Sequence, residues 1–149
     1  MLLLFVCTSN TCRSPMAEAL AKHWLTQHPS PSVRVRSLAL SDEFEPPGSP
    51  ASAHGVAAMA RRGIDMQAHR SRLITKDLVD EADVIYCVTV RHASLLRERF
   101  PDARAEIAIF PADIADPWHQ DEQVYEACAR QIQEAVNLFM PTLLQRWRK

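Results

Sequence analysis

Two residues near the N-terminus, Cys7 and Arg13, combine the types and the spacing needed to attack and hold an oxyanion. The apolar run 1–6 precedes them and predicts a fully buried strand. Pro15 follows them and fits the first turn of a helix, where its missing N–H is not needed. A tight loop between a strand and a helix points several backbone N–H groups at one spot, beside the positive end of the helix dipole. The sequence therefore predicts an anion-binding loop at residues 7–14.

The side chains of this loop suit nucleophilic attack on a phosphoryl group. A thiolate is the nucleophilic form of cysteine, and a helix N-terminus or a nearby cation lowers the pKa of a thiol from about 8.5 to roughly 3.5–7.5. The guanidinium of Arg13 offers a planar fork of donors that fits two oxygens of a tetrahedral anion. The hydroxyl of Ser14 is expected to bond the Cys7 sulfur and help it leave. The alternative is a Cys7 that only packs in the core, with Arg13 as a surface charge.

A second candidate for chemistry is the carboxyl of Asp116, which Pro117 and Trp118 follow. The leaving atom must take a proton as its bond to phosphorus breaks, and a positioned carboxyl supplies one. Pro117 restricts Asp116 to an extended conformation and stiffens the loop. Asp113 has no proline after it and is the weaker candidate for this acid. A plain turn is the alternative interpretation of the Asp-Pro pair.

The elements that must position these residues follow from hydrophobic periodicity. Apolar or alternating runs predict four strands, at residues 1–6, 32–40, 83–88 and 105–110. Helical spacing and helix-ending residues predict helices at 16–28, 50–60, 75–81, 91–99 and 121–139. The alternation predicts an α/β fold of three layers, in which a four-stranded parallel sheet is flanked by helices on both faces. The anion-binding loop then lies at the carboxyl end of the first strand, where open sheets place ligands.

The last predicted helix carries an apolar stripe that steps by three or four residues. Its members are Val124, Cys128, Ile132, Ala135, Val136 and Phe139. Pro141 is expected to kink or end this helix, because proline removes a backbone hydrogen bond. Cys87 and Cys128 lie in apolar contexts and are predicted to be packing residues. For Tyr125, exposure near the acid loop and burial at the edge of the core are both open.

Composition bounds the class of protein. With 149 residues, of which 47% are hydrophobic, the chain is predicted to form a single domain, 1–149, with a full core. A formal net charge of −1 and the absence of a long basic run argue against nucleic acid or an anionic membrane as the main partner. The first apolar run is too short for a signal peptide core or a membrane span. Four cysteines without a secretion signal favour reduced thiols, so we expect a cytoplasmic protein.

The stretch from Cys7 to Glu18, CTSNTCRSPMAE, resembles the signature of the low-molecular-weight protein tyrosine phosphatases. The bacterial protein-arginine phosphatases and thioredoxin-coupled arsenate reductases share that fold, which is flavodoxin-like. The resemblance implies a phosphoprotein phosphatase that forms a cysteinyl-phosphate on Cys7, with Arg13 holding the phosphate and Asp116 as general acid. It assigns phosphate binding to Thr8, Ser9, Asn10, Thr11, Cys12, Arg13 and Ser14.

The resemblance also implies a network behind the loop that braces it. Its members are Asn10, Ser14, Ser37 and His69. Asn10 suits this role chemically, because asparagine tolerates a left-handed backbone and bonds its own backbone. For His69 the alternative is a surface histidine near a loop.

Two further expectations concern the loop itself. By the resemblance, Cys7 and Cys12 form a reversible disulfide that protects the nucleophile from over-oxidation. The chain also departs from the family pattern, because Ser9 and Ala39 stand where the family usually has glycine. We expect these two losses to change the fine geometry of the loop.

The residue before the second loop cysteine bears on the choice of substrate. Tyrosine-directed relatives commonly carry a bulky aliphatic residue there, whereas this chain has Thr11, like the protein-arginine phosphatases. A threonine hydroxyl can orient the guanidinium of phosphoarginine or the attacking water. Thr89 also resembles the arginine-directed group, because tyrosine phosphatases often have aspartate there. We expect Thr11 and Trp118 to form the substrate wall, with phosphoarginine favoured and phosphotyrosine close behind; a neutral replacement at Thr11 is the other interpretation.

Two other function classes use the same loop. Thioredoxin-coupled arsenate reduction needs two more cysteines near each other beyond the third strand, whereas Cys87 and Cys128 are far apart in the sequence. A catalytically inactive phosphoprotein-binding module is the second alternative, and the presence of Cys7, Arg13 and Asp116 together argues against it. We expect no metal and no cofactor, because no second close cysteine pair follows and because Arg13 and the loop amides supply the positive potential.

Overall fold

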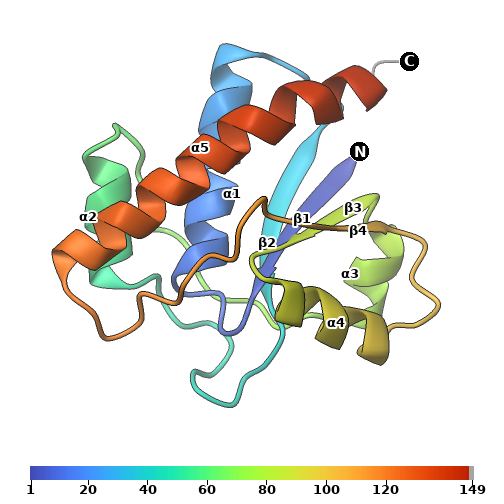
Figure 1. The fold of residues 1–149 in the computed structure, drawn as a ribbon, viewed down its shortest axis with the longest axis horizontal. Helices are drawn as coiled ribbons and strands as arrows, with labels where there is room; N and C mark the ends of the chain where they lie inside the picture. The colour runs from blue at the N-terminus through green and yellow to red at the C-terminus, as the bar shows by residue number, and fades with distance from the viewer. Residues whose placement is uncertain (148–149) are drawn as a thin grey trace.

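The chain folds around a four-stranded parallel sheet, which a computed structural model describes together with its helices for residues 1–147 (Figure 1). The strand order is β2-β1-β3-β4. The strands are β1 (Leu2–Cys7), β2 (Arg34–Ala39), β3 (Val84–Cys87) and β4 (Glu106–Ile109). All three pairings are parallel, as the sequence predicted. Because the chain leaves β1 toward β2 on one side and returns to β3 on the other, the carboxyl end of β1 lies at the point where the strand order reverses.

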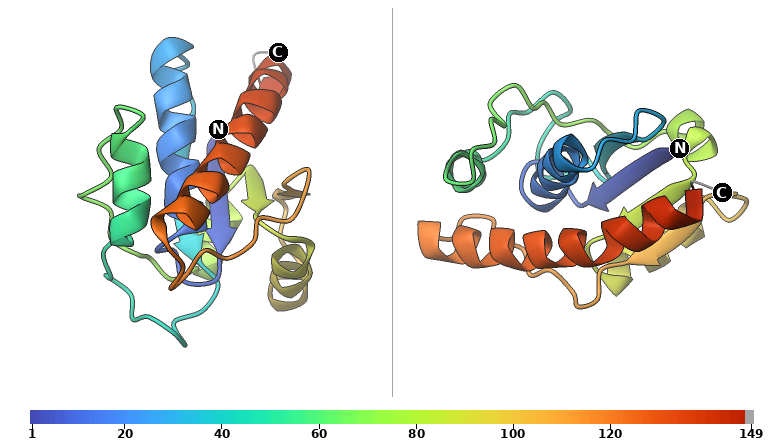
Figure 2. Two further views of the ribbon diagram at one scale, coloured as in Figure 1. Left: turned by 60° about the vertical axis from the view of Figure 1, so that its left-hand side comes forward. Right: turned by 90° about the horizontal axis from the view of Figure 1, so that it is seen from above.

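Helices cover both faces of this sheet. They are α1 (Arg13–Gln27), α2 (Ala53–Ala60), α3 (Lys76–Glu81), α4 (Val90–Arg99) and α5 (Glu122–Trp147). Figure 2 shows α1, α2 and α5 gathered on one side of the strands, with α4 on the other. The predicted three-layer α/β architecture is therefore confirmed. None of the helices in residues 1–147 combines the length and the apolarity that a membrane span needs.

Both faces of β1 are buried, which is why its sequence is continuously apolar. Leu3 and Phe5 point into a core shared with α1, α2 and α5. Leu2, Leu4 and Val6 point into a second core against α3 and α4. All six residues of β1 are buried. The strand that precedes the predicted anion-binding loop is thus held from both sides.

Local signals fix several helix ends. α1 begins at Arg13, with Pro15 in its first turn as expected. Gly63, shortly after α2, has a φ of +75°, the left-handed conformation that ends helices. Thr75 caps α3 by accepting the N–H of Leu78, and Thr89 caps α4 in the same way.

The last helix differs from expectation in two respects. It continues to Trp147 with Pro141 inside it, so the predicted end near residue 139 is wrong. Proline in a helix interior costs about 3 kcal/mol, but the residues around and beyond it, Met140, Leu143 and Leu144, are buried in the core. Burial of side chains of this size contributes roughly 1.5–3 kcal/mol each, which offsets that cost.

The predicted apolar stripe of α5 also needs one correction. Val124 is 40% exposed and lies outside the core. Tyr125, one position further on, is buried instead, which decides between the two alternatives for that residue. Cys128, Ile132, Ala135 and Val136 are buried as predicted. The helix therefore turns its Tyr125 face inward at its N-terminal end.

Candidate active site

A cavity of about 120 Å³ lies at the carboxyl end of β1, beside the start of α1. Its lining residues come from three parts of the chain: Cys7, Thr8, Ser9, Thr11, Cys12, Arg13, Phe44, Asp116 and Trp118. The fold thus brings the predicted nucleophile, the predicted phosphate clamp and the predicted acid to one enclosed space, although the sequence places the acid far from the other two.

The sulfur of Cys7 lies in a polar setting inside an otherwise apolar region. Its Sγ accepts the backbone N–H of Ser14 at 3.4 Å and lies 2.9 Å from the hydroxyl oxygen of Ser14. Ser14 belongs to the first turn of α1, whose unpaired N–H groups carry the positive end of the helix dipole. This arrangement stabilises negative charge on the sulfur.

The guanidinium of Arg13 is buried and held by the segment that carries Ile114 and Asp116. Its Nη1 donates to the carbonyl oxygen of Ile114 at 2.8 Å, and its Nη2 lies 3.8 Å from Asp116 Oδ2. Ile114 is itself tied to the sheet, because its N–H donates to the carbonyl of Val88. One edge of the guanidinium is therefore anchored by protein, which leaves other N–H donors of the fork for a ligand.

The two candidate acids have different positions. The carboxylate of Asp116 lines the cavity, accepts the N–H of Trp118 at 3.1 Å and is 49% exposed. The carboxylate of Asp113 instead accepts the N–H of Val90 at the first turn of α4. Asp113 thus has a structural role at a helix end, and Asp116 is the carboxyl beside Cys7.

The four residues of the predicted network contact one another behind the loop. Asn10 has a left-handed φ of +59° and lies at its centre. Its Nδ2 donates to the hydroxyls of Ser14 and Ser37, both at 2.8 Å, and its Oδ1 accepts the backbone N–H of Arg72 at 3.0 Å. The ring of His69 reaches the backbone carbonyl of Asn10 at 2.8 Å. His69 therefore contacts the loop, rather than being only a surface histidine near it.

These contacts fix the direction of a hydrogen bond at the nucleophile. The backbone N–H of Arg72 can only donate, so the amide oxygen of Asn10 faces it and the amide nitrogen faces the serines. The Ser14 hydroxyl accepts from that nitrogen, and its own proton is then available to the Cys7 sulfur. Asn10 therefore orients Ser14 as a donor toward Cys7.

The loop accommodates the missing family glycines without strain. Among residues 1–147, the non-glycine residues with positive φ are Asn10 and His119, so neither Ser9 nor Ala39 needs a left-handed backbone. Ala39 ends β2 in register with Cys7. A Cβ at these two positions is compatible with the backbone that the loop and the strand adopt.

Cys12, like Cys7, is buried and lines the cavity. Its Sγ is 3.2 Å from the hydroxyl of Tyr125 and 3.8 Å from that of Thr11. Burial raises the pKa of the Cys12 thiol, and burial together with the Cys12 contact also raises the pKa of Tyr125. Cys12 is thus held as a neutral thiol.

Sequence reasoning missed His92, which contacts the loop from α4. Its Nε2 lies 2.9 Å from the hydroxyl of Thr8, and its Nδ1 lies 2.5 Å from that of Thr89. Burial, reinforced by the positive charge of Arg13, lowers the pKa of His92 to about 4. His92 is therefore neutral at physiological pH and ties the residue after the nucleophile to the start of α4. Its place in the first turn of α4, which follows β3, becomes a usable signal only once β3 is known to neighbour β1.

Phe44 was also missed, because its segment carries no periodicity. It lines the cavity together with Trp118, and the two ring centroids are 5.9 Å apart. Both rings are substantially exposed, at 55% and 37%. Together they form an aromatic rim, which consists of Phe44 and Trp118 and borders the mouth of the cavity.

Comparison with known proteins agrees with this geometry. The family model for low molecular weight phosphotyrosine protein phosphatases matches residues 2–149. The chain is similar to a protein-arginine-phosphatase of Geobacillus stearothermophilus, with 35% identity over 142 residues, covering 91% of this chain and 90% of that protein. It is also similar to the probable low molecular weight protein-tyrosine-phosphatase EpsP of Ralstonia nicotianae, with 32% identity over 145 residues, covering 95% and 94%.

A solved structure extends the likeness to three dimensions. The YwlE arginine phosphatase, as a cysteine-to-serine mutant with a phosphorylated active-site serine, superimposes with a TM-score of 0.90 at 28% identity, over 99% of both chains. The family model spans nearly the whole sequence, and the two relatives exceed 30% identity over most of it. The chain belongs to the low molecular weight phosphotyrosine protein phosphatase family.

Proposed function

We propose that this chain is a cysteine-dependent phosphoprotein phosphatase with one catalytic domain over residues 1–149, and that phosphoarginine is its preferred substrate. The observation that carries the proposal is the single cavity lined by Cys7, Arg13 and Asp116. Nucleophile, charge clamp and proton donor are the three groups that phosphoryl transfer to a thiolate and then to water requires. They meet there without a metal-ligand cluster in the described residues.

In the first step the Cys7 thiolate attacks phosphorus opposite the leaving atom, and a sulfur–phosphorus bond forms as the phosphorus–nitrogen or phosphorus–oxygen bond breaks. Arg13 and the backbone N–H groups of residues 8–13 hold the three equatorial oxygens. Asp116 gives its proton to the leaving nitrogen or oxygen. The Ser14 hydroxyl, oriented by Asn10, donates to the sulfur and stabilises its negative charge.

In the second step water attacks the cysteinyl-phosphate, and the Cys7 thiolate leaves. Asp116, now ionised, accepts the proton of the attacking water. The Ser14 hydroxyl lies 2.9 Å from the sulfur and stabilises the departing charge. Cys7, Arg13 and Asp116 thus serve both steps, and inorganic phosphate is released.

The choice between substrates rests on Thr11 and the aromatic rim. Thr11 is buried and lines the cavity, and its hydroxyl lies 3.8 Å from the Cys12 sulfur. That hydroxyl is able to orient a guanidinium or the attacking water. The aromatic rim suits either a tyrosine ring, by stacking, or a guanidinium, by a cation–π contact. Thr11 therefore carries the preference for phosphoarginine, while the rim permits both.

The test compares steady-state kinetics on matched phosphoarginine and phosphotyrosine peptides. We expect kcat/KM to favour phosphoarginine, and Thr11→Ile to reverse the preference. Thr11→Ser, which keeps the hydroxyl, is the matched control and should retain it. A ratio that Thr11→Ile leaves unchanged would remove Thr11 from the account of specificity, and a wild-type preference for phosphotyrosine would overturn the proposed substrate.

Redox control of the same site is part of the proposal. Cys7 and Cys12 line one cavity, and all four cysteines are free thiols, which fits a cytoplasmic location. A peroxide would oxidise Cys7 to a sulfenic acid, and the Cys12 thiol would condense with it, releasing water and forming a disulfide that a thiol reductant reverses. After excess peroxide, dithiothreitol should restore activity in the wild type but not in Cys12→Ser, where the unpaired sulfenic acid oxidises further to sulfinic acid.

The two alternative functions fare less well. Cys87 lies in the core that packs against α3 and α4, whereas Cys128, on α5, lies in the core that α1, α2 and α5 share. The sheet separates them, and burial raises the pKa of each thiol to about 12, so neither suits a disulfide relay for arsenate reduction. Turnover of p-nitrophenyl phosphate distinguishes the remaining alternative, an inactive phosphoprotein-binding module, from a phosphatase.

A further inference from the structure

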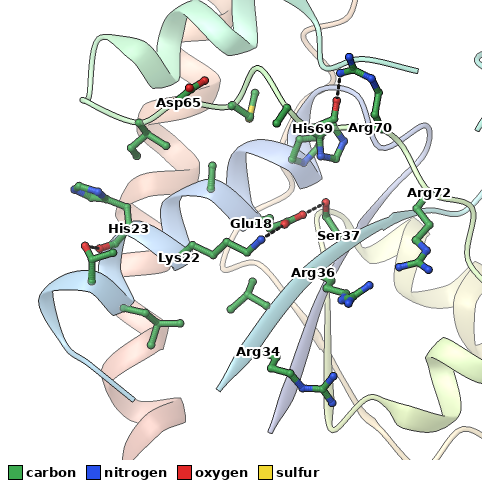
Figure 3. A pocket seen from close by; sticks show the side chains of 18 of the residues that line it. Glu18, Lys22, His23, Arg34, Arg36, Ser37, Asp65, His69, Arg70 and Arg72 are labelled. Atoms are coloured by element: carbon green, nitrogen blue, oxygen red, sulfur yellow. Dashed lines mark hydrogen bonds and ion pairs between the residues drawn. The ribbon is translucent and has the colours of Figure 1, made fainter. Parts of the chain in front are cut away.

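A second and larger cavity lies along the free side of β2. It measures about 950 Å³ and shares no lining residue with the active-site cavity. Figure 3 shows it between α1, β2 and the segment 63–72. β2 is an edge strand, and the backbone of Ala39 at its end pairs with residues 72 and 74. Residues 33–37 line the cavity instead.

Positive charge is concentrated around this cavity. Five cationic side chains line it, against two carboxylates: Lys22, Arg34, Arg36, Arg70 and Arg72, against Glu18 and Asp65. The whole chain has a formal net charge of −1, so this surface departs strongly from the average. We call the cavity and these side chains the basic groove.

Two of the five cations are free for a ligand, and a third, Arg34, can be recruited. Lys22 pairs with Glu18, and Arg70 donates to the backbone carbonyls of Gln67 and His69. Arg34 pairs with Glu81 outside the groove, but both side chains are exposed, so a ligand carboxylate can replace Glu81 at little cost. Arg36 and Arg72 are exposed, and in residues 1–147 no carboxylate lies within 4.0 Å of either guanidinium. Figure 3 shows Arg34, Arg36 and Arg72 following one another on the same side of the groove. The groove therefore presents a row of donors for carboxylates.

The shape of the groove favours an extended chain over a compact anion. The five residues 33–37 span about 16 Å at roughly 3.3 Å per residue, which is far longer than a phosphate ion. Apolar side chains line the groove together with the charges, namely those of Ala19, Leu25, Val33, Ile64 and Ala68. Arg34 and Arg36 are two residues apart on an edge strand, so they point to the same side. An extended peptide with carboxylates at alternate positions matches that spacing.

We propose that the basic groove is a docking site for an extended acidic segment of a partner protein, with carboxylates at alternate positions and apolar residues between them. The inference is independent of the chemistry proposed at Cys7. The groove lies directly behind the anion-binding loop, residues 7–14, because Ser37 and His69 line the groove and both contact Asn10. A partner docked there is held next to the active site without entering it.

The test measures binding of fluorescent peptides by anisotropy at low salt. The probe is a short peptide that alternates glutamate and valine, and its controls carry glutamine in place of glutamate, or the same glutamates clustered at one end. We expect the alternating peptide to bind most tightly. Because exposed charges contribute modestly, Arg36→Glu should weaken its binding about tenfold. Arg130→Glu, an equal change of charge on the exposed face of α5, should leave it within twofold.

Several outcomes would overturn the proposal. Equal weakening by the two charge reversals would show attraction to the whole protein rather than to the groove. Equal binding of the clustered peptide would show that the alternating spacing of the carboxylates does not matter. Complete displacement by millimolar inorganic phosphate would show a simple anion site. Thermal melting and p-nitrophenyl phosphate turnover check that Arg36→Glu is folded; if it is not, Arg36→Gln, with an expected threefold effect, replaces it.

Discussion

The two sides of the active-site cavity are built in opposite ways. On one side the anion-binding loop is enclosed, with Asn10 and Ser14 fully buried and Arg13 5% exposed. On the other side the carboxylate of Asp116 and the aromatic rim reach into solvent. A fixed set of donors stabilises developing charge most effectively because it does not reorganise during the reaction. The exposed side is able to adapt to the leaving group. We therefore assign stability and charge stabilisation to the loop, proton transfer to Asp116, and contact with the leaving group to the aromatic rim.

The largest effect is expected at the loop, from Cys7→Ser. The hydroxyl is a far weaker nucleophile than a thiolate, so turnover of p-nitrophenyl phosphate should fall by roughly 10⁴–10⁶-fold. Arg13 and the loop amides stay in place, so binding of inorganic phosphate, measured by calorimetry, should persist within a fewfold. Turnover within tenfold of the wild type would show that another group attacks phosphorus.

The next largest effect is expected on the rim side, from Asp116→Ala. Loss of the proton donor should lower kcat on phosphopeptides by about 10²–10⁴-fold. Thermal stability should hardly change, because the side chain is half exposed. The matched control is Asp113→Ala, which removes a carboxylate that bonds the first turn of α4. It should lower stability by about 1 kcal/mol and leave kcat within threefold, and the reverse pattern would exchange the roles of the two aspartates.

Asn10→Ala should lower both stability and activity, because Asn10 belongs to the rigid loop side of the cavity. It leaves the N–H of Arg72 without its acceptor and the Ser14 hydroxyl without its orienting donor. We expect a loss of about 2–4 kcal/mol in the free energy of unfolding, measured by denaturant titration, and lower turnover. Asn10→Gly removes the same hydrogen bonds but relieves the left-handed backbone, so it should recover about 1 kcal/mol. Equal losses in the two variants would show that backbone strain contributes nothing.

His92 makes the stability of the loop region dependent on pH. Its pKa is about 4 in the folded chain against about 6.5 in the unfolded one. Between these values the unfolded chain binds more protons, so the free energy of unfolding should decrease as the pH falls from 6.5 toward 4. At about 1.4 kcal/mol for each pH unit, the decrease amounts to at most roughly 3 kcal/mol. Above pH 6.5 this contribution is constant.

His92→Asn tests this prediction by denaturant titration at several pH values. The variant should lose most of the pH dependence in that window. His119→Asn is the control, because His119 is exposed and has a left-handed backbone that asparagine tolerates. A slope that His92→Asn leaves intact would assign the pH dependence to other groups.

Local signals in the sequence predict one part of the site, whereas contacts between distant segments determine the rest. The strand, loop and helix around Cys7 follow from local signals, namely an apolar run, a short polar segment and Pro15. The contact of His92 with Thr8 depends on strands β1 and β3 being neighbours, and no local pattern encodes it. Phe44 reaches the cavity from a segment without periodicity, which only the folded chain can place.

Pro141 is the opposite case, in which a clear local signal is overridden by packing. Its local preference is clear and predicts a helix end, yet α5 continues past it. Burial of Leu143 and Leu144 in the core outweighs the missing hydrogen bond. Local propensity was reliable at Gly63, where the chain is exposed and no packing opposes it, and unreliable at Pro141, where packing does.

The smallest effect is expected from the aromatic rim. It is the sharpest test of the difference between the two sides of the cavity. Trp118→Ala removes one ring from the mouth of the cavity but no group from the loop. A partly exposed ring contributes about 1 kcal/mol to a flat or cationic partner, so KM for phosphopeptides should rise about fivefold. Turnover of p-nitrophenyl phosphate at saturation and the free energy of unfolding should stay unchanged. If kcat or the free energy of unfolding fell while KM rose, the aromatic rim would be part of the rigid charge-stabilising structure, and the two sides of the cavity would have the same role.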